Sequence, residues 1–177
     1  MLSDLESSFD AERRADLVAQ SAELAEAEHA SIEVVDRLRG TVGRPIHVRT
    51  RSGAPVDGVL TRVEPAYVLV DEGEGLQAIV PMAAVTTVAT LAGPAPRDDR
   101  RRPTLGALLR EIARRGARVR LIAGAGEVMG RLVRVGADHV DIALDSEGRG
   151  CVRRATGAGV VGVVSVMTAA IEVLRSR

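Results

Sequence analysis

Residues 43–88 read GRPIHVRTRSGAPVDGVLTRVEPAYVLVDEGEGLQAIVPMAAVTTV, and a second segment with the same pattern begins at residue 116. This second copy reads GARVRLIAGAGEVMGRLVRVGADHVDIALDSEGRG over 116–150 and, after a glycine-rich insert, GVVSVMTAAIEVL over 162–174. When the copies are aligned on Gly58 and Gly130, GVLTRV matches GRLVRV. An internal repeat indicates the architecture before any single residue is interpreted. We therefore expect one small β-rich unit to be built twice.

Apolar and polar residues alternate with a period of two in the first copy, which is typical of β-strands. Gly, Pro and Ser turns separate the short runs, and Pro81-Met82-Ala83-Ala84 predicts a tight helical turn before the last one. The predicted strands cover 46–50, 59–63, 67–70, 78–80 and 85–88. Five short strands at this spacing predict a small barrel in each copy.

Helices are expected before each copy. Residues 4–39 contain neither Gly nor Pro and are rich in Ala, Glu, Leu and Arg, which favours helix, and Gly40 is a natural stop. Thr104 is expected to cap a short amphipathic helix over 105–115 that ends at Gly116. The expected fold class is therefore α+β, an N-terminal helix followed by two small five-stranded β-barrels. The expected organisation is an N-terminal helix at 1–40, a first barrel at 41–92, a linker at 93–103, and a short helix with the second barrel at 104–177.

The motifs of the second copy carry a resemblance to a known family. The helix over 105–115 is followed by Val119-Arg120-Leu121, by Gly130-Arg131-Leu132 and by an apolar run at 140–144. This arrangement resembles the Sm-like family, which includes the Sm and Hfq RNA-binding proteins, and residues 81–88 are similar to a Lys-His-Ala-Ile-Ser segment of Hfq. Other small SH3-like barrels share much of the pattern. The resemblance implies edge strands that pair between subunits, as they do in Sm rings.

The resemblance also implies RNA binding, but the residues that Sm proteins use for it do not carry over. Asp141 and Leu69 stand where those proteins have an Asn. Val80-Pro81 and Val166-Met167 stand where they have an Arg-Gly pair, and the Lys-His pair of Hfq is absent. An Asp repels phosphates, and the chain has only one Tyr and one Phe for base stacking.

Composition limits the classes of function. All 24 basic residues are arginine, which is typical of a GC-rich genome, and the net charge is zero. Residues 1–39 carry a net charge of −6 and the remainder +6. This asymmetry allows either weak anion binding by the β-rich part or docking of the acidic segment on it. The single Cys151 excludes an internal disulfide, and the sequence has neither a signal-peptide pattern nor an 18-residue apolar run. We expect a cytoplasmic protein with no membrane partner.

No motif predicts catalysis, a cofactor or a metal. Residues 157–162 spell G-x-G-x-x-G, but a dinucleotide site needs a βαβ unit, which the remaining residues are too few to form. His29, His47 and His139 lack a second ligand at metal spacing, and no base is expected beside Cys151. We expect the protein not to be an enzyme.

Two functions remain. The leading expectation is a non-enzymatic assembly protein that associates with itself or with a protein partner through strand edges and the N-terminal helix. The alternative is an RNA- or DNA-binding regulator that uses arginine-rich barrel faces. The candidate nucleic-acid-binding residues are Arg118, Arg120, Arg131, Arg134, Arg153 and Arg154. We favour an ordinary solvated sheet face as the explanation of these arginines.

Overall fold

A computed structural model describes residues 2–96, 103–124, 126–145 and 162–177. The chain forms two compact units, residues 1–34 and 35–177. The first unit is helix α1 (Leu2–Ser31). The single helix predicted over 4–39 is wrong in its second part, because a separate helix α2 (Val34–Thr41) follows a break at Ile32 and Glu33. Leu38 and Thr41 of α2 are buried in the second unit, so packing rather than helix propensity determines where this helix lies.

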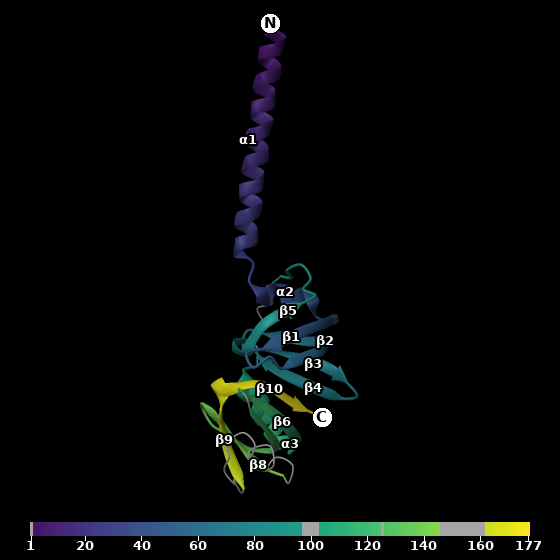
Figure 1. Ribbon diagram of the computed structural model, residues 1–177, viewed down its shortest axis with the longest axis vertical. Coiled ribbons are helices and arrows are strands. Elements are labelled where there is room, and N and C mark those ends of the chain that lie inside the picture. Colours follow the sequence, from purple (N-terminus) through teal and green to yellow (C-terminus); the bar gives the residue numbers. More distant parts are fainter. Residues whose placement is uncertain (1, 97–102, 125, 146–161) are drawn as a thin grey trace. The chain divides into compact units, whose positions relative to one another are not determined.

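The second unit alternates short helices with two sets of strands (Figure 1). The first set consists of β1 (Pro45–Thr50), β2 (Pro55–Glu64), β3 (Tyr67–Gly73), β4 (Leu76–Pro81), the 3-10 turn η1 (Met82–Ala84) and β5 (Val85–Ala89). The second set consists of α3 (Leu105–Arg115), β6 (Arg118–Ala123), β7 (Gly126–Val135), β8 (His139–Leu144), β9 (Val163–Met167), the 3-10 turn η2 (Thr168–Ala170) and β10 (Ile171–Ser176). Each set places a one-turn helix before its last strand, as Pro81–Ala84 predicted for the first copy.

The expectation of two closed five-stranded barrels is wrong. The described strands form one ten-stranded sheet in the order β5-β1-β2-β3-β4-β10-β6-β7-β8-β9. Every described strand pairing is antiparallel, and β10 lies between β4 and β6 (Figure 1). The physical reason is that β4 pairs with β10 of the second repeat. It does not pair with β5 of the first repeat, which would close a barrel. The result is one open sheet whose outer strands are β5 and β9.

The pairing of β4 with β10 merges the two apolar cores. One buried cluster contains Leu109, Leu121 and Ile142 of the second repeat together with Tyr67 and Ile79 of the first. The other contains the first repeat's buried valines and leucines and also Val173 of β10, with Ile122 of β6 packed against it. Because each cluster takes side chains from both repeats, neither repeat has a complete core of its own.

Steric contact with the neighbouring strand explains why glycine occupies the same place in both copies. A Cβ atom on Gly58 of β2 would overlap the carbonyl oxygen of Asp71, and one on Gly130 of β7 would overlap that of Ala143. The neighbouring strand lies too close to leave room for a Cβ atom at these points, so only glycine fits there. The second copy also begins as predicted, because the Thr104 hydroxyl accepts the Ala107 amide at 3.2 Å and Gly116 ends α3 in the left-handed region, with φ 62°.

Candidate functional site

The pairing of β4 with β10 shows how this sequence joins one repeat to another. Leu174 lies opposite Ile79, Arg175 opposite Ala78 and Ser176 opposite Gln77. The pairing satisfies backbone donors and acceptors that an edge strand would leave open. We call this region the junction.

A charged pair holds the junction on one face. Arg175 of β10 donates two hydrogen bonds to Glu72 of β3, from Nε to Oε2 at 2.6 Å and from Nη2 to Oε1 at 2.9 Å. The side chains are only 14% and 13% exposed, and Arg175 also donates to the Pro55 carbonyl at 2.8 Å. A two-pronged guanidinium–carboxylate pair of this kind adds geometric specificity as well as attraction.

A buried carboxylate holds the junction at its other end. Glu172 of β10 is 3% exposed and accepts hydrogen bonds on Oε2 from the amide (2.9 Å) and hydroxyl (2.6 Å) of Ser52. Arg51 lies 3.8 Å from Oε1 and donates to the Ala169 carbonyl at 3.0 Å. Burial acts to raise the pKa of Glu172, but the Ser52 hydrogen bonds and the Arg51 charge outweigh it and hold that pKa below its ordinary value. The turn between β1 and β2 of the first repeat thus binds the last strand of the second repeat through hydrogen bonds and an ion pair.

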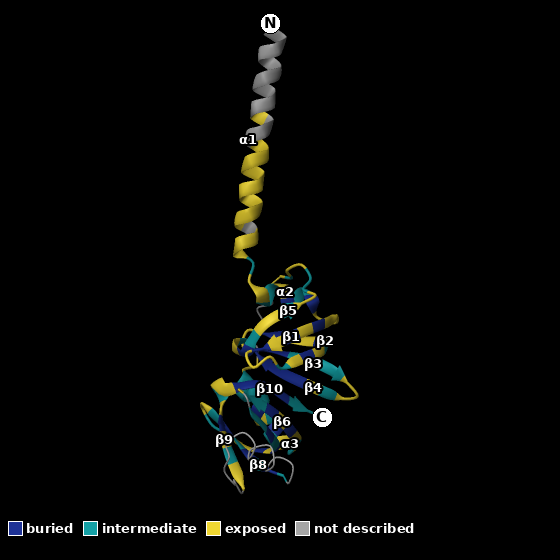
Figure 2. Ribbon diagram, viewed as in Figure 1, coloured by how far each residue is buried: buried dark blue, intermediate teal, exposed yellow. Residues whose placement is uncertain are grey.

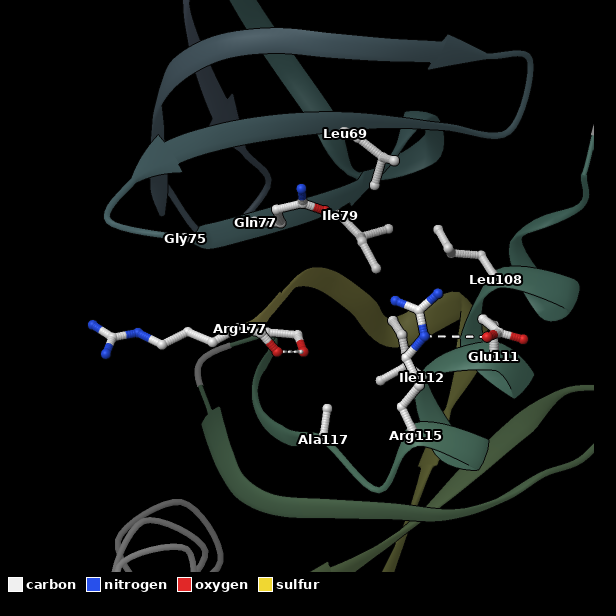
Figure 3. A pocket seen from close by; sticks show the side chains of 11 residues that line it. Leu69, Gly75, Gln77, Ile79, Leu108, Glu111, Ile112, Arg115, Ala117 and Arg177 are labelled. Atoms are coloured by element: carbon white, nitrogen blue, oxygen red, sulfur yellow. Dashed lines mark hydrogen bonds and ion pairs between the residues drawn. The ribbon is translucent and has the colours of Figure 1, made fainter.

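Helix α3 covers part of the junction. Leu108 and Ile112 of α3 line a groove of about 240 Å³ and face Leu69 and Ile79 of the first repeat (Figure 3). The polar part of this groove includes the Glu111–Arg115 ion pair, whose atoms lie 3.1 Å apart (Figure 3). Because the facing surfaces are apolar, α3 adds hydrophobic burial to the backbone pairing.

The outer strands of the described sheet carry no charged side chain. β5 reads Val-Thr-Thr-Val-Ala and β9 reads Val-Val-Ser-Val-Met. Val163 and Met167 of β9 are 54% and 51% exposed, and three residues of β5 are exposed (Figure 2). Natural proteins usually protect sheet edges with Lys, other charges or Pro. Neither β5 nor β9 carries such a residue.

Four of the six arginines predicted to bind nucleic acid lie on the neighbouring strands β6 and β7. Arg118 and Arg120 lie on β6, Arg131 lies opposite Arg118 on β7, and Arg134 lies further along β7. Arg153 and Arg154 lie outside the described residues, as do Cys151 and most of the 157–162 glycine motif.

These arginines are in contact with acceptors of the same face. Arg118 donates to Asp145 at 2.7 Å and Arg120 to Glu127 at 2.9 Å. Arg131 donates to the Gly116 carbonyl at 2.6 Å, and Arg134 lies 3.9 Å from Asp141. Three of these four arginines are therefore in ion pairs with carboxylates, and Arg131 contacts a backbone carbonyl. Arg118 and Arg120 also line a groove of about 410 Å³ beside the junction, together with Leu76, Met129, Arg175 and Arg177.

Two side chains of the first repeat, Tyr67 and Glu64, bury polar atoms. The Tyr67 hydroxyl and Oε2 of Glu64 are buried without a hydrogen-bond partner among the described residues. Burial, followed by the negative charge of Glu64, raises the pKa of Tyr67.

Among the described residues, no group of three or more His, Cys, Asp and Glu side chains is placed to hold a metal ion. No helix in the described part of the chain has the length and apolar content needed to span a membrane.

Sequence analysis missed the junction residues Glu72, Glu172 and Arg175. A signal was present, because Glu172 interrupts the apolar run Ile171–Leu174, but its partner Ser52 lies 120 positions away. Comparison with known proteins finds no family model that matches the chain, and no curated protein matches it either. The fold itself defines the class of the second unit: an antiparallel sheet protein built from two repeats, with β5 and β9 as the outer strands of the described sheet.

Proposed function

We propose that this protein is a non-enzymatic assembly protein that associates with itself through the outer strands β5 and β9. One observation carries the proposal: the chain already joins two repeats by edge-to-edge pairing of β4 with β10. The outer strands are uncharged, and exposed apolar side chains lie on β9. Open edges of this kind are templates for pairing with another chain.

The N-terminal helix is a second candidate surface for association. The side chains of Leu17, Val18 and Leu24 on α1 are exposed. Three apolar residues on a strongly acidic helix favour a protein partner with positive charge more than a second acidic helix, because like charges repel.

Light scattering on the native protein, with a matched pair of variants, tests the proposal. Val163→Lys places a charge on the β9 edge, whereas Val133→Lys makes the same change at a valine of β7 that is 55% exposed but lies inside the sheet. We expect assemblies for the native protein and for Val133→Lys, and monomers for Val163→Lys. A monomeric native protein at about 100 μM, far above the Kd of typical specific interfaces, would rule the proposal out.

RNA or DNA binding is the alternative, and the groove lined by Arg118 and Arg120 is what favours it. The ion pairs of these arginines with Asp145 and Glu127 weigh against it, because phosphates would have to compete with carboxylates already in place. Filter binding to poly-U and poly-A at two salt concentrations separates the two functions. Retention at low salt that falls steeply with added salt, and that is lost in Arg118→Gln/Arg120→Gln, supports the alternative.

A further inference from the structure

The groove between α3 and the first repeat has apolar walls that the chain itself does not fill. Leu108 and Ile112 of α3 lie on one side of it, and Leu69 and Ile79 of β3 and β4 lie on the other (Figure 3). Ile79 and Ile112 are buried, whereas Leu69 and Leu108 are partly exposed. The volume of about 240 Å³ is that of about eight water molecules in the liquid. Since aliphatic walls offer water no hydrogen bonds, the groove favours an apolar occupant.

The helix that precedes the first repeat is covered differently, by a segment of the chain. The Ala92 amide donates to the Thr41 hydroxyl of α2 at 2.9 Å, and the Ala95 amide donates to the Asp36 carbonyl at 3.0 Å. Arg37 of α2 donates in turn to the Ala92 carbonyl at 3.2 Å. No segment among the described residues fills the groove beside α3 in this way.

One cation at the mouth of the groove faces these walls. Arg115 of α3 lines the groove, is 71% exposed, and donates from Nε to Oε1 of Glu111 at 3.1 Å. Figure 3 shows its two Nη nitrogens turned to the side of Ile79 and Leu108. Within the described part of the chain, Glu111 is the one acceptor that bonds this guanidinium. Both Nη nitrogens can therefore donate to an acceptor placed in the groove.

Glu111 does not cancel the positive charge at this mouth. Its carboxylate pairs with Arg114 as well as with Arg115, so two guanidinium groups share one carboxylate. Arg177 also lines the groove, but its guanidinium points away from Ile112 (Figure 3). The planar fork of an arginine matches a carboxylate, which can accept a hydrogen bond on each oxygen. Arg115 thus favours a second, external carboxylate.

We propose that this groove binds a medium-chain carboxylate, a small molecule with a linear alkyl chain of about six to eight carbons, which matches the volume of the groove. The alkyl chain lies against the four apolar side chains of the walls, and the carboxylate accepts hydrogen bonds from the Nη nitrogens of Arg115. The site lies within one copy of the chain and does not depend on the proposed self-association.

The position of the groove gives binding a structural consequence. One wall belongs to the first repeat and the other to α3 of the second, so the ligand contacts both sides of the junction. A ligand that binds only the folded protein stabilises it by mass action. At a concentration of 100 times its Kd, the ratio of folded to unfolded protein rises about 100-fold.

Calorimetric titration of the full chain tests the chemistry of the ligand. The probes are butyrate, hexanoate and octanoate, with 1-octanol and octylammonium as controls that keep the alkyl chain and change the head group. We expect the affinity to rise about fourfold for each added methylene, because each one is removed from water. Octanol should bind about tenfold more weakly than octanoate, and octylammonium should not bind, because Arg115 repels it.

Two arginines that share Glu111 provide matched variants. Arg115→Gln should weaken octanoate binding about tenfold and leave octanol binding unchanged. Arg114→Gln removes the other partner of Glu111, at a side chain that is 73% exposed and lines a different groove. Its effect on octanoate binding should stay within about twofold.

A second pair of variants tests the place of the alkyl chain. Ala117→Leu adds a larger side chain to this groove and should abolish binding of both octanoate and octanol. Ala107→Leu makes the same change on α3 at a residue that lines the other groove, and should leave binding intact.

Three results would overturn the inference. They are no heat of binding at about 10 mM octanoate, tenfold above a Kd of 1 mM, equal binding of octanoate and octylammonium, and octanoate binding that is unchanged in Arg115→Gln. This last variant decides the question even if Ala117→Leu does not fold. None of these results bears on the proposed function, which light scattering tests without a ligand.

Discussion

Among the acidic side chains that the structure describes, Glu172 is the most completely buried, and it stays charged because Ser52 and Arg51 surround it. Its carboxylate connects the turn between β1 and β2 to a strand more than a hundred residues later. A single residue thus contributes to the contact between the two repeats.

Replacing Glu172 with Gln tests this contribution and its pH dependence. The pKa of Glu172 lies below its ordinary value in the folded protein, so the unfolded chain binds the proton more tightly. The stabilisation is therefore complete above the ordinary pKa of 4.5 and is lost as the pH falls through the lower, folded pKa. We expect Glu172→Gln to lower the free energy of unfolding by about 1–3 kcal/mol near neutral pH. The difference in the free energy of unfolding between the wild type and Glu172→Gln, measured by urea unfolding, should become smaller below about pH 4.5.

Glu111→Gln is the control for this measurement, because Glu111 is 40% exposed and its ion pairs with Arg114 and Arg115 lie on the surface. Its effect should stay within about 1 kcal/mol. A difference in unfolding free energy between the wild type and Glu172→Gln that does not change with pH would contradict stabilisation by the charged Glu172 carboxylate.

Strands β2 and β7, each the middle strand of its repeat, depend on close backbone approach at Gly58 and Gly130. The same substitution at two glycines separates this effect from general loss of flexibility. We expect Gly130→Ala to lower the free energy of unfolding by about 1–3 kcal/mol or more, because its Cβ would overlap the Ala143 carbonyl.

Gly106 provides the comparison, because it lies in α3 and a Cβ there meets only the end of the Arg110 side chain, at 3.5 Å. Gly106→Ala should raise the free energy of unfolding by about 0.5–1 kcal/mol, since Ala is the better helix former. Equal effects of the two substitutions on the free energy of unfolding would show that the neighbouring strand leaves room for a Cβ atom at Gly130.

Sequence reasoning was most accurate where one element determines its own structure. The Pro81–Ala84 turn, the Thr104 cap and the Gly116 stop all depend on neighbouring residues, and the structure contains each of them. The repeat itself was visible because Gly58 and Gly130 must both be glycine.

The single sheet was not predictable in the same way. Backbone pairing between β4 and β10 joins residues about a hundred positions apart and leaves no periodic pattern in either strand. The ion pairs of the arginine face were missed for a related reason, since Arg118 and Asp145 are 27 positions apart and meet only through the pairing of β6, β7 and β8.

At the scale of the whole molecule, shared cores make the sheet unit unfold as one body. Tyr67 and Ile79 belong to the cluster of the second repeat, and Val173 belongs to that of the first. We expect one thermal transition for residues 35–177, with equal calorimetric and van't Hoff enthalpies.

Ile79→Ala probes this coupling, because Ile79 lies in the first repeat but packs in the second repeat's cluster. It should lower the free energy of unfolding by about 2–5 kcal/mol while the single transition is retained. Val59→Ala, at a 40% exposed position of the same repeat, should have little effect. Two resolved transitions in either variant would show that the repeats unfold independently.

The junction also has a consequence for protein synthesis. The ribosome must add residues 82–170 after β4 is complete before β10 can emerge and pair with it. During that interval β4 has no β10 strand of its own chain to pair with, so its edge stays open while the second repeat is synthesised.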